Sequence, residues 1–197
     1  MTLNTLQDLM VDNLKDLYNA ERQILGALPR LAKAAKTPAL KEALESHRRQ
    51  TETHVARLEE VFGILELPAR GKACRGMEGL IAEGKEVLGA DGEDPVRDAG
   101  IIAAAQKVEH YEIAAYGSAA TYAQLLGQED VARLLGETLD EEKAADEKLS
   151  ALAEGEVNDR AMRAGGESEG ETEDPESEVE DTGRASTTTR KARRRRR

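Results

Sequence analysis

Tryptophan is absent from this chain of 197 residues, aromatic residues make up only 3%, and there is a single cysteine, Cys74. One cysteine excludes an internal disulfide framework and fits a reducing compartment, so we expect a cytoplasmic protein. The scarcity of aromatic residues argues against a β-sandwich. No apolar run approaches about 18 residues, and the N-terminus has no basic region followed by an apolar run. Neither a membrane span nor a signal peptide is therefore expected.

Alanine, leucine, glutamate and lysine dominate the sequence instead, which is typical of long helices. The net charge of −11 is unevenly distributed. Residues 155–183 are acidic and poor in apolar residues, and residues 184–197 hold eight lysines and arginines and no acidic residue. Segments of this composition do not bury enough apolar surface to fold. We expect one folded domain at residues 1–154 and a disordered tail at residues 155–197, acidic first and then arginine-rich.

Apolar residues recur with spacings of three and four in four long segments, which predicts four amphipathic helices. They lie at about residues 4–35, 38–65, 94–126 and 128–153. A capping residue followed by proline opens the second and the third, and Gly127 is a typical helix end. Pro29 falls inside the first, where we expect a kink or a local break.

Very short turns join the first helix to the second and the third to the fourth, so each pair forms an antiparallel hairpin. The connection between the hairpins, about residues 66–93, is long enough to cross the bundle and holds a short helical pattern at residues 77–88. Two hairpins with one long crossover make an all-α, ferritin-like four-helix bundle. An up-down-up-down bundle with short loops is the competing topology, which the long connection disfavours.

Polar residues interrupt the apolar stripe of all four helices, and an ionised carboxylate on a buried face is costly unless it is paired or bound to a metal. In the first hairpin, residues equidistant from the turn lie at one height, which places His54 level with Glu21. Gln50 is then about one turn, roughly 5 Å, away. His47 lies about 10 Å further along the axis than His54.

In the second hairpin, the same counting places Glu112 beside Glu142 and Glu109 beside Asp146. Both hairpins thus bring polar residues to one level of the bundle. The stripe of the last helix leaves open whether Glu142 or Glu141 faces the interior.

Oxygen-rich ligands with one or two imidazoles suit iron or manganese in a dinuclear carboxylate site, and no Cys/His spacing typical of zinc is present. We predict two iron or manganese ions as cofactors. The predicted metal ligands are Glu21, His54, Glu109, Glu112, Glu142 and Asp146, with Gln50 as a weaker candidate. Tyr116, one turn beyond Glu112, could hydrogen-bond a ligand. The alternative is that each glutamate is a boundary residue whose charge reaches solvent and each histidine is half-buried and hydrogen-bonded.

Four segments around these residues resemble the YciE/YciF family of ferritin-like stress proteins, which is the domain of unknown function 892. They are LKDLYNAERQ from Leu14, HVARLE from His54, VEHYEI from Val108 and TLDEEKA from Thr138. The resemblance covers about residues 3–153. It implies a rubrerythrin-like four-helix bundle, a homodimer and a dinuclear metal site.

The resemblance implies no known reaction, so whether the protein is an enzyme stays open. We expect a stress-response protein that acts in iron handling or peroxide detoxification. One position departs from the family, because relatives commonly have glutamate where this chain has Gln50. Gln50 is neutral and a poorer ligand, so the second helix would contribute only His54.

Two other interpretations remain. The chain could be a metal-free helical interaction module whose tip, the arginine run that begins at Arg193 and ends at Arg197, binds DNA or another polyanion. The acidic half of the tail could instead fold back on this basic half. A shell-forming ferritin or a DNA-protecting mini-ferritin is less favoured than either the metal centre or the interaction module.

Overall fold

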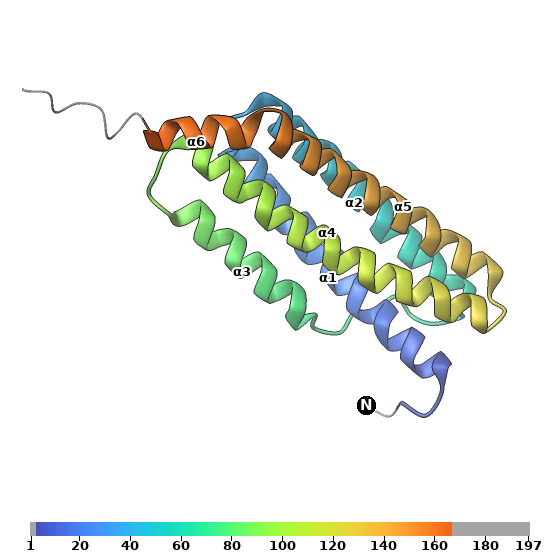
Figure 1. Ribbon diagram of the computed structural model, residues 1–197. Coiled ribbons are helices and arrows are strands. Elements are labelled where there is room, and N and C mark those ends of the chain that lie inside the picture. The colour runs from blue at the N-terminus through green and yellow to red at the C-terminus, as the bar shows by residue number, and fades with distance from the viewer. Residues whose placement is uncertain (1–2, 167–197) are drawn as a thin grey trace, which may run out of the picture.

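The structure, a computed structural model, describes residues 3–166, and every regular element among them is a helix (Figure 1). Four long helices form the bundle, and a shorter one, α3, lies in the crossover. The elements are α1 (Leu6–Ala34), α2 (Pro38–Ile64), α3 (Arg75–Gly89), α4 (Asp94–Leu125), α5 (Glu129–Leu152), the π-helical turn η1 (Ala153–Val157) and α6 (Asn158–Gly166). The predicted all-α bundle of two hairpins joined by a long crossover is confirmed.

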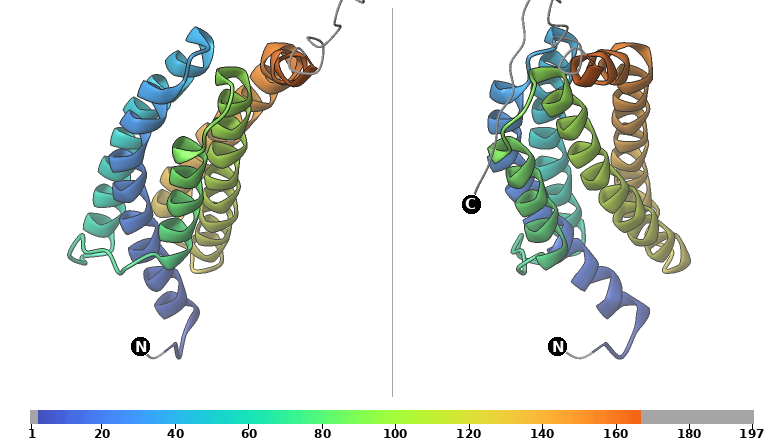
Figure 2. Two further views of the ribbon diagram at one scale, coloured as in Figure 1. Left: turned by 90° about the vertical axis from the view of Figure 1, so that its left-hand side faces the viewer. Right: turned by 60° about the vertical axis from the view of Figure 1, so that its left-hand side comes forward.

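The four long helices enclose one interior. α1 packs against α2 and α4, and α5 packs against α4 and α2, so the two hairpins lie side by side. The crossover helix α3 packs on the outside of this ring, against α1 and α4 (Figures 1 and 2). The polar side chains that the sequence places on the inner stripes therefore face one another across the bundle.

The turn between α1 and α2 is tied to α4 by a buried carboxylate. Asp98 accepts hydrogen bonds from the backbone N–H groups of Lys36 at 2.9 Å and Thr37 at 2.7 Å.

Gly127 has the left-handed φ of 68° that the predicted helix end requires. α1 continues through Pro29 to Ala34, so the predicted local break does not occur. Pro29 lies on the exposed face, where water can satisfy the carbonyl that loses its partner.

Helical structure extends past the predicted domain boundary at residue 154, to Gly166, which corrects the start of the expected disordered tail. The side chain of Val157 is buried, and Arg160 donates to the hydroxyl of Thr37 at 3.4 Å. α6 thus lies across the end of the bundle that holds the α1–α2 turn (Figure 1). The rest of the predicted tail, including Arg193 and Arg197, lies outside the described residues.

The core consists of two apolar clusters, one toward each end of the bundle. One cluster contains Leu14, Leu58 and Leu135, and the other contains Leu28 and Leu44, each with many further apolar residues. Between them, all four long helices contribute buried polar side chains. Among the described residues, no helix is both long enough and apolar enough to cross a membrane.

Candidate metal centre

The buried polar layer in the middle of the bundle consists of four glutamates and two histidines. All six are at least nine-tenths buried, His47 being the most exposed at 7%. α1 contributes Glu21, α2 contributes His47 and His54, α4 contributes Glu109 and Glu112, and α5 contributes Glu142. These side chains replace apolar residues on the inner stripes, so packing of the stripes brings them together.

The layer divides into two groups that share one carboxylate. His47, Glu109, Glu112 and Glu142 form one group and Glu21, His54 and Glu142 the other, and within each group one ligand atom per residue lies within 4.8 Å of the others. Nδ1 of His54 lies 3.0 Å from Oε1 of Glu142 and 3.5 Å from Oε1 of Glu21. Nε2 of His47 lies 3.4 Å from Oε1 of Glu109 and 3.9 Å from Oε2 of Glu142. Glu142 is therefore the one residue that the two groups share.

Many of these buried polar atoms have no hydrogen-bond partner in the protein. Both carboxylate oxygens of Glu112, Oε2 of Glu109, Oε2 of Glu142 and both ring nitrogens of His47 are in this state. A buried donor or acceptor without a partner costs about 1–3 kcal/mol. These converging side chains could hold a metal ion, since carboxylates and imidazoles are the usual ligands of iron and manganese.

The pKa values in the layer are displaced by burial and by crowding of like charges. Burial raises the pKa of Glu109 and Glu112 well above the ordinary range, and the charge of Glu142 raises that of Glu109 further. Burial also raises the pKa of Glu21. Without a cation, the neutral forms of Glu109 and Glu112 are therefore favoured. A metal ion reverses this preference, because it binds the ionised form.

The two histidines differ. Burial lowers the pKa of His47. Burial also acts to lower the pKa of His54, but its contacts with Glu142 and Glu21 outweigh this and raise it to about 10. In the absence of metal, His54 is thus the cation that balances the neighbouring carboxylates.

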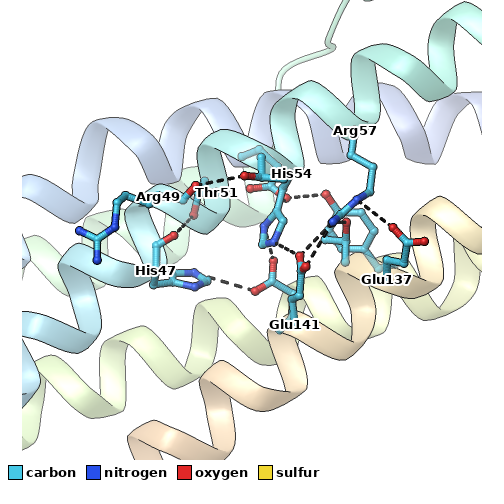
Figure 3. Close-up of polar contacts among 12 residues, drawn as sticks. His47, Arg49, Thr51, His54, Arg57, Glu137 and Glu141 are labelled. Carbon is cyan, nitrogen blue, oxygen red and sulfur yellow. Dashed lines mark hydrogen bonds and ion pairs between the residues drawn. The ribbon is translucent and has the colours of Figure 1, made fainter.

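Groups outside the layer orient its members. Tyr116, which is itself fully buried, donates its hydroxyl hydrogen to Oε1 of Glu21. On the other side, Nε2 of His54 lies 2.8 Å from Oε2 of Glu141, and Nη1 of Arg57 donates to the same oxygen at 2.9 Å (Figure 3). Glu142 therefore takes the interior position that the sequence left open, and Glu141 supports His54 from the rim.

Replacing Glu141 by glutamine is expected to weaken metal binding about 10- to 100-fold, the usual effect of losing a carboxylate behind a ligating imidazole. The reason is that Nε2–H of His54 donates to Glu141, which directs Nδ1 toward Glu21 and Glu142. Competition with a chromophoric chelator measures the affinity. Glu137→Gln is the matched control, since Glu137 also contacts Arg57, at 3.6 Å, and is 46% exposed. Equal losses in both variants would contradict the role of Glu141.

Five of the predicted ligands come together in the layer, namely Glu21, His54, Glu109, Glu112 and Glu142. Asp146 lies outside both groups: Gln106 donates to its Oδ1 at 3.2 Å, and Nε2 of His110 is 3.4 Å from its Oδ2. A short aspartate one turn from Glu142 does not reach the axis. Gln50 is half-buried and lines a small cavity together with His47 and Glu109.

His47 belongs to the layer although the sequence placed it about 10 Å from His54 along the axis. The centroids of the two imidazole rings are 6.3 Å apart. Glu109 lies one turn nearer than Glu112 to the end that holds the α1–α2 turn, so it meets His47 there. The signal that could have found His47 was its position on the same stripe as His54, seven residues earlier.

Comparisons with known proteins agree with this architecture. The family model described as Domain of unknown function (DUF892) matches residues 5–162. The curated protein YciF of Escherichia coli K12 is 44% identical over 162 residues, which is 82% of this chain and 98% of that protein. The crystal structure of the E. coli stress protein YciF matches with a TM-score of 0.76 at 45% identity, over 79% of this chain and 98% of that one.

A second solved structure, YcfI from Rhodopseudomonas palustris, matches with a TM-score of 0.74 at 42% identity. It covers 75% of this chain and 94% of that one. The agreement thus extends over the four long helices and α3 rather than over one motif. The chain belongs to the DUF892 family and is a relative of the stress protein YciF.

Proposed function

We propose that this protein holds two iron or manganese ions in the buried layer and uses them in iron handling or peroxide detoxification under stress. His47, Glu109 and Glu112 would hold one ion, and Glu21 and His54 the other. Glu142 would be shared between them. The stress context comes from the E. coli relative, which is called a stress protein.

The observation that carries the proposal is the donor set. Four glutamates and two histidines are the ligands of the ferritin-like di-metal carboxylate proteins, although here both histidines come from α2. Four carboxylates also balance the charge of two divalent ions, which makes the buried layer neutral. Without metal, the same side chains leave many polar atoms without partners.

Two bound redox-active ions would supply the electrons for peroxide reduction. In iron handling, ferrous ions would themselves lose electrons at this site. The protein's own contribution is the dry, rigid setting. The apolar clusters above and below exclude bulk water, and the hydroxyl of Tyr116 fixes the carboxylate of Glu21. Peroxidase-like activity of the iron-loaded protein is therefore part of the proposal.

Glu142→Gln is expected to abolish binding of at least one ion per chain, because it removes the shared charge while keeping the side-chain size. Elemental analysis of protein purified after iron or manganese loading measures the stoichiometry. Glu147→Gln, an exposed position on the same helix, is the control and should retain wild-type metal content. Unchanged stoichiometry in Glu142→Gln would refute the assignment, provided that thermal melting shows both variants folded.

Two further expectations rest on the sequence alone, namely a cytoplasmic location and a homodimer. Nucleic-acid binding through the arginine run from Arg193 to Arg197 belongs to the alternative function, a metal-free interaction module. Sedimentation analysis would test the dimer. A gel shift that compares the full chain with one ending at Gly183 would test the arginine run.

A further inference from the structure

A cavity lies between the crossover helix α3 and the helices α1 and α4. It is narrow, because the centre of a water-sized sphere can occupy only about 40 Å³ of it. Apolar side chains from all three helices form most of its wall, among them Ile24, Leu28, Leu31, Leu80, Ile81 and Val108.

Small residues create this space where α3 crosses α4. Gly84 of α3 faces Ala104 of α4, and a Cβ placed on Gly84 would lie 3.7 Å from the Cβ of Ala104. Both residues line the cavity. Larger side chains at these two positions would close it, so the space depends on their identity.

The two ends of the cavity differ in chemistry. At the inner end, His47 and Glu109 line the wall, and both are more than nine-tenths buried. Both ring nitrogens of His47 and Oε2 of Glu109 have no hydrogen-bond partner in the protein. The cavity therefore reaches the buried layer from the side of α3.

At the outer end, the cavity is lined by two exposed cations, Arg30 of α1 and Lys85 of α3. Neither forms an ion pair or a side-chain hydrogen bond with any of residues 3–166, whereas the neighbouring Lys107 is paired with Glu83. Two unpaired cations at the mouth of an apolar cavity suit an anion that carries an apolar chain.

We infer that this cavity binds a carboxylate with an unbranched alkyl chain of medium length. The carboxylate group lies at Arg30 and Lys85, and the chain extends along the apolar wall toward His47 and Glu109. The wall offers few hydrogen-bonding groups, which disfavours sugars and nucleotides. The contact between the chain end and the metal positions rests on the proposed function. Binding in the cavity does not depend on it.

Isothermal titration of decanoate into metal-free, full-length protein tests this inference. We expect saturable binding at one site. Ala104→Leu should abolish it by filling the cavity. The double variant Arg30→Gln/Lys85→Gln should weaken it about tenfold, as expected for two exposed charge contacts. Arg133→Gln/Lys143→Gln, which removes two exposed cations of α5, is the matched control and should bind as the wild type does.

The absence of saturable binding overturns the inference, as does undiminished binding by Ala104→Leu or an equal loss in the two double variants. The double variant at Arg30 and Lys85 changes only exposed side chains, so it guards against misfolding of Ala104→Leu. Metal stoichiometry of the same preparations separates the two proposals. Decanoate binding without metal binding leaves the cavity site intact and refutes the metal centre, and the reverse result refutes the cavity site alone.

Discussion

Addition of Mn²⁺ or Fe²⁺ to metal-free protein is expected to raise the midpoint of thermal unfolding by about 10 °C or more. A ligand that binds only the folded state at a free concentration of about 1,000 times its dissociation constant stabilises by about 4 kcal/mol per site. For a chain of this size each kcal/mol shifts the midpoint by about 2–4 °C. Tight binding is expected because a metal ion would give partners to both oxygens of Glu112 and to Oε2 of Glu142. Differential scanning calorimetry under anaerobic conditions measures it.

The control for this experiment is Glu142→Gln, which should show little of the increase, while Glu147→Gln should respond as the wild type does. A chelator should reverse the increase. An equal rise in Glu142→Gln would place the binding elsewhere, for example on the acidic residues 155–183, and would contradict the metal centre.

The pH dependence of stability is expected to have opposite slopes with and without metal. In the metal-free protein, the pKa of His54 is about 10 when folded and about 6.5 when unfolded, so the folded state binds this proton more tightly. The resulting stabilisation is complete below pH 6.5 and is lost as the pH rises toward 10, on the order of 1.4 kcal/mol for each pH unit. The raised pKa values of Glu109 and Glu112 act in the same direction.

The lowered pKa of His47 acts in the opposite direction, but only as the pH falls below 6.5, so above pH 6.5 it does not oppose the effect of His54, Glu109 and Glu112. Metal binding requires deprotonated ligands, so the metal-loaded protein should gain stability as the pH rises through this window. Urea denaturation at pH 7 and pH 9 measures both slopes. Metal-free protein whose stability is constant or rises between these values would contradict the electrostatics of the layer.

Much of this architecture follows from the sequence because the helices are long and their apolar stripes are regular. α6 was missed for a physical reason. Val157 lies four residues after Ala153, but Gly155 is a poor helix former and the other neighbours of Val157 are polar, so this buried residue is isolated in the sequence. The apolar pattern therefore ends near residue 154 although the helix continues.

The site was predictable to the extent that height along the bundle determines it. Counting from the hairpin turns gives the height of each Cα, and it paired His54 with Glu21 and Glu112 with Glu142, residues that also lie together in the structure. It does not give the reach of the side chain. Glu109 and His47 have long side chains that meet across the bundle, whereas the shorter Asp146 remains at the rim with Gln106.

A titration of metal-free protein with Mn²⁺, followed by electron paramagnetic resonance, tests the central claim most directly. The signal of free Mn²⁺ should be suppressed until two ions per chain have been added, and the bound ions should show the spectrum of a coupled pair, because both groups that would hold them contain Glu142. Free-ion signal from the first addition, or a titration that Glu142→Gln leaves unchanged, would contradict the claim that this buried layer is a dinuclear metal centre.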